Sequence, residues 1–270
     1  MSDIFLQFQT QVWDYYHDHG RDLPWRLPES NGVFDPYKIL VSELMLQQTQ
    51  VARVIQKFNE FIVAYPTVQS LANSSLGDVL RLWQGLGYNR RAKFLHESAK
   101  KIVELGAFPS DDVGLQSLPG VGKNTAGAIL AYAYNQPAIF IETNVRAVYI
   151  HHFFSEQDLV DDKQIQELLE QTIDHEHPRE FYWALMDYGS QLKREGVTPN
   201  RSAHYKKQSP LKGSVREVRG QILSILSTGD TTMAHLEDRY GDDERFPSAL
   251  SGLVADGLVM IHDDDIYLTK

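Results

Sequence analysis

Apolar residues recur at helical spacing through the first two hundred residues, and no stretch there alternates between apolar and polar side chains as a strand would. This pattern predicts that the first two hundred residues are all-α. Residues 21–36, RDLPWRLPESNGVFDP, are rich in turn-forming residues and predict a loop. We expect helices over residues 1–20, 37–62 with a break near Gln48, 76–84, 90–105, 143–154, 164–173 and 179–192, and a further helix beginning near Thr125.

The composition changes near residue 193. Residues 193–219 are polar, basic and short of apolar side chains, which predicts a linker or an ordered polar loop. Beyond them we expect helices in EVRGQILSILS and FPSALSGLVADG, then a short hairpin turning at Asp263 to Asp265. This order is typical of a small α+β winged-helix domain. We therefore divide the chain into residues 1–205, a helical domain, and residues 206–270, a basic linker with a winged-helix-like domain.

The composition excludes several classes of protein. No run approaches the roughly 18 consecutive apolar residues that indicate a membrane span, and the N-terminus lacks a signal-peptide pattern. We therefore expect a cytoplasmic protein without a membrane partner. Because the chain has no cysteine, it cannot form a disulfide, a thiolate zinc site or a cysteine-ligated iron–sulfur cluster.

The net charge of −10 argues against nucleic acid as a partner only if the charge is spread evenly. Positive charge is instead concentrated in the helix expected at 90–105 and in the linker, whereas acidic residues gather after residue 236. Local basic patches are sufficient for phosphate binding. The basic residues are Arg90, Arg91, Lys93, Lys100 and Lys101 in the helix, and Lys193, Arg194, Arg201, Lys206, Lys207, Lys212, Arg216 and Arg219 in the linker.

The stretch LPGVGKNTAGAIL, residues 118–130, places two glycines before a helix of small residues. Gly120 and Gly122 lack Cβ atoms, so a phosphate can approach the backbone closely. The positive end of the following helix would face the same phosphate. Taken alone, the stretch is equally compatible with a structural turn.

Together with PYKILVSELMLQQTQV at 36–51 and GLGYNRRAKFLH at 85–96, this hairpin resembles the helix-hairpin-helix DNA glycosylases, most closely their adenine-mismatch branch. The resemblance covers about residues 20 to 195. It implies two helical subdomains with the active site in the cleft between them. It also implies double-stranded DNA with a damaged or mismatched base as the partner, and we expect a monomer associated with the nucleoid.

Hydrolysis of an N-glycosidic bond requires protonation of the departing base and stabilisation of the positive charge on the sugar. Glu43 lies in a mostly apolar helix, where desolvation would raise its pKa and suit a general acid, and the resemblance implies this role. The family places its second carboxylate, an Asp, about twenty residues past the hairpin glycines, where this chain has Glu142. The resemblance further implies that Asn144 orients a water molecule or a carboxylate.

Glu142 is one methylene longer than Asp, so its carboxylate reaches about 1.5 Å further, whereas catalytic geometry tolerates about 0.5 Å. Either the backbone is set back to compensate, or the substrate differs, or the enzyme is impaired. We expect the first.

The resemblance also implies a set of DNA contacts. Gln48 and Tyr88 match the residues that fill the gap left by a flipped base, although Tyr88 would otherwise be interpreted as a core aromatic. Asn124 stands where bifunctional relatives carry a nucleophilic Lys, so we expect no lyase activity. The remaining predicted contacts are Arg21 and Arg26 near the flipped base, Thr49 beside Gln48, and Gly120, Gly122, Lys123, Asn124 and Thr125 at the phosphate, where the family commonly holds a monovalent ion.

Three departures affect the identity of the base. Trp183 stands where adenine-directed members carry Gln or Glu, and the cysteine-free KREGVTPNRSAHYKKQ replaces a four-cysteine cluster loop. We also expect no counterpart of the domain that helps the family find 8-oxoguanine. We predict a monofunctional DNA glycosylase, without a resident metal or other cofactor, that removes a purine, namely mismatched adenine. The alternatives are a glycosylase for thymine or uracil opposite guanine, one for a deaminated purine, and a non-catalytic protein that binds damaged DNA.

Overall fold

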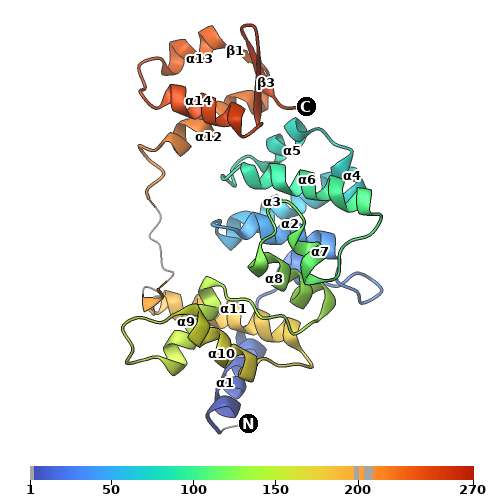
Figure 1. The fold of residues 1–270 in the computed structure, drawn as a ribbon, viewed down its shortest axis with the longest axis vertical. Helices are drawn as coiled ribbons and strands as arrows, with labels where there is room; N and C mark the ends of the chain where they lie inside the picture. The colour runs from blue at the N-terminus through green and yellow to red at the C-terminus, as the bar shows by residue number, and fades with distance from the viewer. Residues whose placement is uncertain (1–2, 198–200, 204–208) are drawn as a thin grey trace. The chain divides into compact units, whose positions relative to one another are not determined.

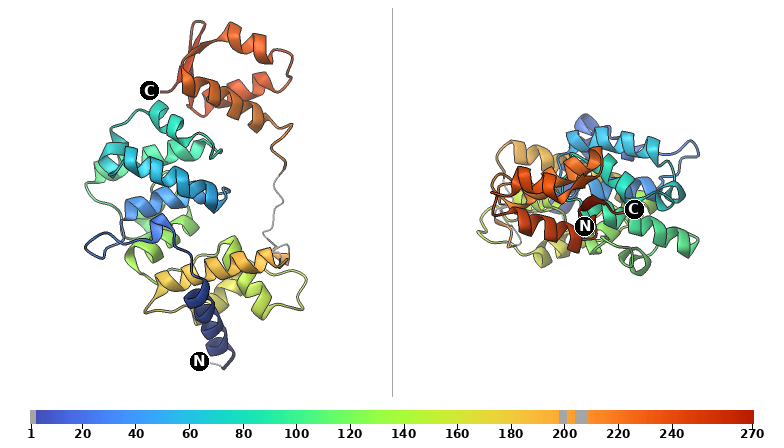
Figure 2. Two further views of the ribbon diagram at one scale, coloured as in Figure 1. Left: turned by 180° about the vertical axis from the view of Figure 1, so that it is seen from behind. Right: turned by 90° about the horizontal axis from the view of Figure 1, so that it is seen from above.

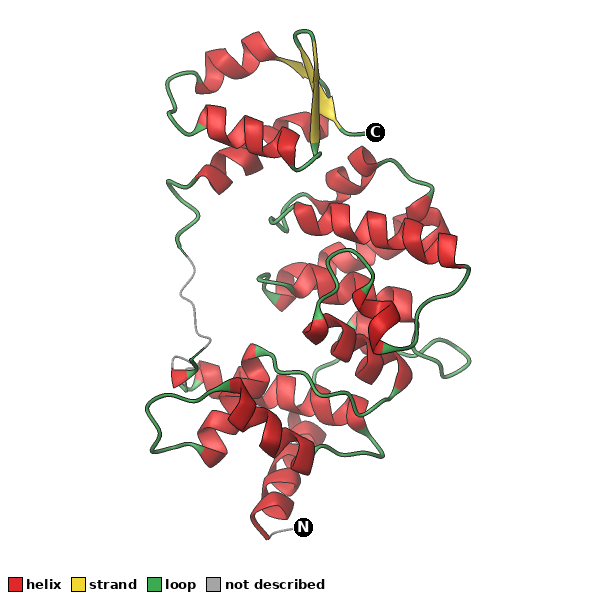
Figure 3. Ribbon diagram, in the orientation of Figure 1, coloured by secondary structure: helices red, strands yellow, loops and turns green. Residues whose placement is uncertain are grey.

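The computed structural model describes residues 3–197, 201–203 and 209–270. Helices dominate these residues, and a small three-stranded sheet lies near the C-terminus (Figures 1 and 3). Contacts divide the chain into two compact units. Unit 1 is Met1–Leu40, Pro109–Ser117 and Val121–Lys207, and unit 2 is Val41–Phe108, Leu118–Gly120 and Gln208–Lys270. Within the described residues, no helix is both long enough and apolar enough to span a membrane.

Unit 1 is built around α11 (Pro178–Arg194), whose buried face carries aromatic residues and contacts three other helices of the unit, α9, α1 and α8. The approach to α9 is close at Gly189, where an added Cβ would lie 2.4 Å from the Asn144 carbonyl oxygen. The other elements are α1 (Asp3–His19), η1 (Pro24–Arg26), α7 (Asp112–Gln116), α8 (Lys123–Tyr134), α9 (Thr143–Phe153) and α10 (Asp162–Thr172).

In unit 2, α6 packs against α4 and α5, and the buried aromatic rings of Phe61 on α3 and Trp83 on α5 lie against each other. The helix α2 (Pro36–Leu46) begins in unit 1 and ends in unit 2. It is separated from the next helix by Gln48, whose φ of 56° is left-handed. The remaining helices here are α3 (Val51–Ala64), α4 (Val68–Ala72), α5 (Leu76–Trp83) and α6 (Arg90–Leu105).

The C-terminal part of unit 2 has the order helix, strand, helix, helix, hairpin that is typical of winged-helix folds. The antiparallel sheet has the order β1-β3-β2, and β2 pairs with β3 from Val259 opposite Leu268 to His262 opposite Asp265. These elements, called here the C-terminal module, can also be followed from behind and from above (Figure 2). They are α12 (Val215–Thr228), β1 (Thr231–Thr232), α13 (Met233–Tyr240), α14 (Phe246–Ala255), β2 (Val259–His262) and β3 (Asp265–Leu268).

The predicted helical fold, the break near Gln48 and the C-terminal hairpin are confirmed. Helices α4 and α7 were missed because five residues are too few to show a 3.6-residue period. The two-residue β1 and the polar helix α13 were missed for the same lack of pattern. An isolated parallel bridge joins Val160 to Ser202 in the part predicted to be all-α. The division at residue 205 falls within residues 204–208, outside the described ones, and stays a prediction.

The contact at Gly189 yields a stability prediction. Gly189→Ala should lower the free energy of unfolding by about 1–3 kcal/mol, because the new methyl group meets the rigid backbone at Asn144. The matched control is Gly220→Ala in α12, where an added Cβ meets nothing within 4 Å. That substitution should stabilise by about 0.4–1 kcal/mol. Urea unfolding followed by circular dichroism measures both, and equal midpoints for Gly189→Ala and the parent chain would contradict the prediction.

Candidate active site

The two hairpin glycines differ in what they do. Gly120 has a left-handed φ of 75°, and an added Cβ would lie 2.7 Å from the Cβ of Phe94 on α6. Gly122 precedes the first residue of α8 with an ordinary φ of −92°, and an added Cβ there would meet nothing within 4 Å. Turn geometry and packing therefore require Gly120, whereas Gly122 leaves open space where the helix begins. The open space at Gly122 is consistent with the close approach of a phosphate.

The first turn of α8 carries the three other predicted phosphate contacts. Lys123 and Asn124 are exposed, Thr125 is half-buried, and no side chain caps the helix. The N–H groups of a helix's first turn have no partner within the helix, so they are available to an anion. Asn124, however, donates from Nδ2 to the carbonyl oxygen of Ile141 at 2.9 Å. Its side chain thus ties the start of α8 to the residue before Glu142.

Glu142 occupies the N-cap position of α9 with extended backbone angles, and its side chain does not cap the helix. Burial raises the pKa of Glu142, and the positive charge of Arg146 opposes that effect. Arg146 is itself paired with Asp162, at 2.7 Å from Nε to Oδ1 and 2.6 Å from Nη2 to Oδ2. The carboxyl of Glu142 therefore keeps its proton to a higher pH than an ordinary glutamate.

Asn144 is held by α11 on both sides of its amide. Its Nδ2 donates to the carbonyl oxygen of Met186 at 3.1 Å, and its Oδ1 accepts from Lys193 Nζ at 3.0 Å. The close backbone contact at Gly189 fixes the same turn of α9. The start of α9, with Glu142 before it, is therefore positioned by α11. The predicted role of Asn144 in orienting water stays a prediction.

Glu43 lies near the C-terminal end of α2 and is half-buried. Its neighbours on the helix are fully buried, including Ser42 and Leu44 at 0% exposure. The carboxylate thus projects from a helix that is otherwise embedded in apolar side chains. Glu43 belongs to unit 2 and Glu142 to unit 1.

Arg91 was predicted to belong to a basic surface on α6, and this interpretation is wrong. The side chain is buried, with 6% of the residue exposed, and burial lowers its pKa to about 10, so that it remains charged at neutral pH. The guanidinium donates to one hydroxyl and to several carbonyl oxygens from two segments. Nη1 contacts the oxygens of Leu44 (2.7 Å), Met45 (2.9 Å) and Gln47 (2.5 Å), and Nη2 contacts Thr49 Oγ1 (3.1 Å), Leu86 O (3.1 Å) and Gly87 O (2.9 Å).

The two segments bound by Arg91 carry the residues predicted to fill the gap in the base stack. Gln48 and Tyr88 are both exposed, and both have left-handed φ angles, of 56° and 47°. Such angles cost non-glycine residues of the order of 1–3 kcal/mol and persist only where surrounding contacts enforce them. Arg91 provides those contacts. Thr49, predicted as a DNA contact, accepts a hydrogen bond from Arg91 and so helps to hold this arrangement.

Asp187 on α11 is a residue that sequence reasoning missed. Only 2% exposed, it accepts from Arg26 Nη1 and Nη2 at 2.8 Å each and from Arg21 Nε at 2.7 Å. The predicted base contacts Arg21 and Arg26 are therefore both engaged by this carboxylate. A lone acidic residue within the apolar run FYWALMDYG was the available signal, because a buried charge needs a partner.

Trp183 lies one turn before Asp187 on α11 and is 6% exposed. Its ring packs against Phe34 and Tyr132 at centroid distances of 5.6 and 6.0 Å, and the Arg26 guanidinium lies 5.3 Å from it. The tryptophan is thus a packing residue of unit 1. Asp187 and the two arginines supply the polar groups in its surroundings.

The basic linker is partly folded back on unit 1. Arg201 Nη1 donates to the carbonyl oxygens of Phe154, Ser155 and Gln157, at 2.9, 2.7 and 3.3 Å. Arg201 therefore holds the loop after α9. Lys206 and Lys207, predicted as phosphate contacts, lie outside the described residues.

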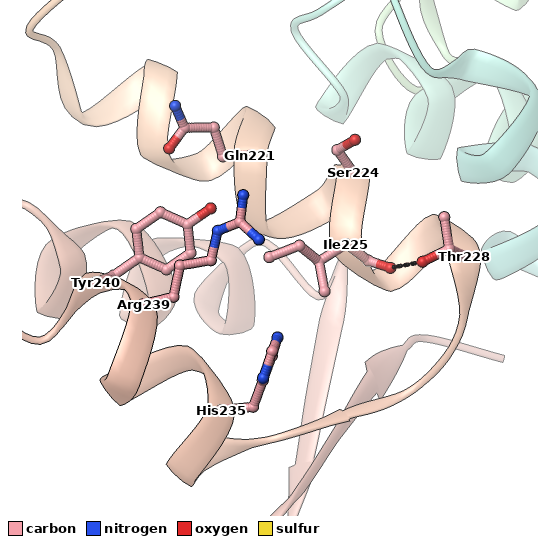
Figure 4. A pocket seen from close by; sticks show the side chains of 7 residues that line it. All are labelled: Gln221, Ser224, Ile225, Thr228, His235, Arg239 and Tyr240. Atoms are coloured by element: carbon pink, nitrogen blue, oxygen red, sulfur yellow. Dashed lines mark hydrogen bonds between the residues drawn. The ribbon is translucent and has the colours of Figure 1, made fainter.

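A hollow of about 580 Å³ lies in the C-terminal module, between α12 and α13 (Figure 4). His235 and Arg239 of α13 line it, together with Ile225 and Tyr240, and none of its lining residues is a predicted site residue. Among the lining residues that the structure describes there is no carboxylate, so the hollow lacks the carboxylate pair predicted for excision.

Comparison with known proteins identifies the family. Residues 41–175 match the family described as HhH-GPD superfamily base excision DNA repair protein. The adenine DNA glycosylase of Mycobacterium tuberculosis is 36% identical over 278 residues, covering 93% of this chain and 89% of the relative. The chain belongs to this superfamily. The adenine DNA glycosylase of Buchnera aphidicola is also 36% identical, over 68% of this chain, and there the chain spans only 52% of the relative's length.

Solved structures of this superfamily share the fold. A thermostable thymine-DNA glycosylase aligns with a TM-score of 0.61 and 24% identity, over 73% of this chain and 96% of that chain. A trapped covalent complex of endonuclease III with DNA aligns with a TM-score of 0.59 and 20% identity, over 78% of this chain and 91% of that chain. The predicted helix-hairpin-helix glycosylase fold is therefore confirmed.

The Asp187 cluster yields a prediction about stability and pH. Asp187→Asn should lower the free energy of unfolding by about 3–5 kcal/mol, because it leaves the buried Arg26 without its counter-charge. Although burial opposes it, the hydrogen bonds and charges of Arg26 and Arg21 lower the pKa of Asp187. Its contribution is therefore complete above the ordinary carboxyl pKa of about 3.9 and is lost as the pH falls through the lower native-state value.

Urea unfolding of Asp187→Asn and the parent chain between pH 3 and pH 7 tests this. The gap between the two should narrow only below about pH 4. Asp162→Asn is the matched control, since its pair with Arg146 is partly exposed and should contribute less. Equal losses from the two substitutions, or a gap that is constant with pH, would show that Asp187 does not stabilise the fold as a buried anion.

Proposed function

We propose that this protein is a monofunctional DNA glycosylase of base excision repair that removes mismatched adenine from double-stranded DNA. The observation that carries the proposal is the 36% identity with the adenine DNA glycosylase of M. tuberculosis over 93% of this chain. The residues that match the superfamily, 41–175, include Glu43 and Glu142. The protein acts as a monomer in the cytoplasm, at the nucleoid, and needs no resident metal or cluster.

Binding begins with the phosphate backbone. The N–H groups at the start of α8 bind a phosphate where Gly122 leaves open space, with Lys123 supplying a positive charge. The backbone carbonyl groups of the hairpin, residues 118–122, would hold a monovalent cation, which would supply further positive charge beside the phosphate. Gln48 and Tyr88, presented by the segments that Arg91 holds, enter the stack and occupy the place of the flipped adenine.

Glu43 then protonates a ring nitrogen of the departing adenine as the bond to C1′ of the sugar breaks. Positive charge develops on the sugar, and the carboxylate of Glu142 stabilises it. Water adds to C1′, which leaves an abasic site, and its proton returns to a carboxylate. Asn144, held by Met186 and Lys193, orients this water.

Removal of the acid tests the assignment of Glu43. Glu43→Gln should lower the single-turnover excision rate by about 10²–10⁴-fold, because the amide keeps the shape but has no proton to transfer. Binding of the mismatched duplex should change little. The control is Glu104→Gln, an exposed residue of α6 with no predicted role.

The substrate panel consists of duplexes that each carry one mismatched or altered base, scored for abasic sites after hot alkali. Adenine in a mismatch should be cut fastest. Faster cleavage of thymine or uracil opposite guanine, or of a deaminated purine, would move the assignment to that base. Tight binding of one duplex without any cleavage would show a damage-binding protein, and an unchanged rate in Glu43→Gln would exclude Glu43 as the acid.

The geometry at Asn124 yields a prediction about lyase chemistry. A Schiff-base lyase needs an amine at the abasic sugar. Asn124 stands at the position of that amine, but its side chain is an amide that donates a hydrogen bond to the Ile141 carbonyl oxygen. Borohydride added during turnover should therefore trap no covalent protein–DNA adduct. A bifunctional glycosylase treated in parallel provides the positive control. A robust adduct with this protein would overturn the monofunctional assignment.

A further inference from the structure

The C-terminal module reaches the predicted intercalating tyrosine. Arg216, in the first turn of α12, donates from Nη1 to the hydroxyl oxygen of Tyr88 at 2.7 Å, and its guanidinium lies 5.7 Å from the centre of the tyrosine ring. Nη2 of the same side chain contacts Ser209, at 2.8 Å to its carbonyl oxygen and 3.1 Å to Oγ. Arg216 thus connects Ser209 of the linker to the turn between α5 and α6.

The module that carries Arg216 also contacts α5 and α6 of unit 2 at other points. Lys93 Nζ of α6 donates to the Asp256 carbonyl oxygen at 2.8 Å, and Gln84 Nε2 donates to the Leu223 carbonyl oxygen at 3.3 Å. On α5, an added Cβ at Gly77 would lie 3.3 Å from Leu268 Cβ of β3. The contact between Arg216 and Tyr88 is therefore one of several between the C-terminal module and these helices.

Tyr88 is a residue whose orientation has to be imposed. Its φ of 47° is left-handed and it is 36% exposed, so apolar packing surrounds only part of the ring. Two guanidinium groups lie near the ring, that of Arg91 at 5.5 Å and that of Arg216 at 5.7 Å. Arg91 fixes the backbone of the turn, whereas Arg216 holds the hydroxyl at the far end of the side chain.

The acidic residue next to Arg216 in the sequence, Glu217, is paired with another arginine. Glu217 is paired with Arg245 at 2.9 Å and accepts from the Gly213 N–H at 2.8 Å. Within the part of the chain that the structure describes, the partners of Arg216 are neutral oxygen atoms of Tyr88, Ser209 and Pro210. A charged donor to a neutral hydroxyl makes a strong hydrogen bond that fixes direction.

We propose that Arg216 is a positioning residue for base extrusion, which orients the Tyr88 ring for insertion and so makes the C-terminal module part of the flipping machinery. The proposal rests on the function given above, in which Tyr88 fills the gap left by the adenine. An inserted ring must arrive in one orientation, because the space between neighbouring bases admits only a flat group. The benefit is confined to the step in which a stacked base leaves the helix.

The test compares Arg216→Ala and Arg216→Lys with Arg239→Ala, which removes an arginine beside Tyr240 on the same module. The probe is 2-aminopurine at the target position, since its fluorescence rises when it unstacks. Arg216→Ala should extrude the base from a mismatched duplex about tenfold more slowly, as expected for loss of one hydrogen bond from a charged donor. Arg216→Lys should recover part of the rate, and Arg239→Ala should match the parent chain.

Two further measurements separate positioning from structural damage. When the target base lies opposite an abasic site, it is already loosely stacked. On this duplex, Arg216→Ala should extrude the base at the same rate as the parent chain. In a double-mutant cycle, Tyr88→Phe should slow extrusion alone and add nothing to Arg216→Ala, because both remove the same bond. Equal losses on both substrates would show general damage, and additive losses would show that the two side chains act separately. Either result overturns the proposal.

The proposal is also overturned if Arg216→Ala extrudes the base at the same rate as the parent chain. A faster rate would overturn it too, because it would show that Arg216 restrains the Tyr88 ring. The fluorescence signal needs no bond cleavage. A chain that extrudes the base normally but leaves no abasic site would therefore refute the glycosylase assignment and leave the role of Arg216 standing.

Discussion

The part of unit 2 predicted to face DNA depends on the buried guanidinium of Arg91. The last carbonyls of a helix have no partner within it, and α2 ends at Leu46 with the Gln48 turn directly after. A cation near a helix C-terminus is favoured by the helix dipole, and a planar guanidinium offers five donors in a fixed fork. Arg91 thereby satisfies the end of α2 and the GLGY turn together. A lysine, with three donors around one point, cannot span both segments.

Unit 1 uses the opposite charge for a similar purpose. The loop that contains Arg21 and Arg26 packs Phe34 against Trp183 of α11, and Asp187 attaches it further through two arginines. Burial of a charge is costly unless it is paired and hydrogen-bonded, so each cluster tolerates little change in its members. In both units, a buried polar cluster thus attaches irregular segments to neighbouring helices.

Periodicity predicted most of the helices, because each long helix buries one face and so repeats every three or four residues. It could not predict which charged residues lie inside. Arg90 and Arg91 are adjacent and identical, yet Arg91 is buried whereas the side chain of Arg90 is 61% exposed. The difference arises from carbonyls contributed by residues 44–47, which local sequence does not reveal. Asn124 was likewise predicted to contact a phosphate, and its bond to Ile141 depends on a segment seventeen residues away.

The surroundings of Glu142 bear on the catalytic role proposed for it. An anion already paired with a cation is stabilised equally before and during the reaction, and such stabilisation does not accelerate the chemistry. The positive charge of Arg146 lowers the pKa of Glu142, but Arg146 is itself hydrogen-bonded to the carboxylate of Asp162. The ionised form of Glu142 is therefore poorly stabilised in the free protein. In the proposed mechanism the ionised form gains most when a positive charge develops on the sugar, which concentrates its interaction with the substrate in the transition state.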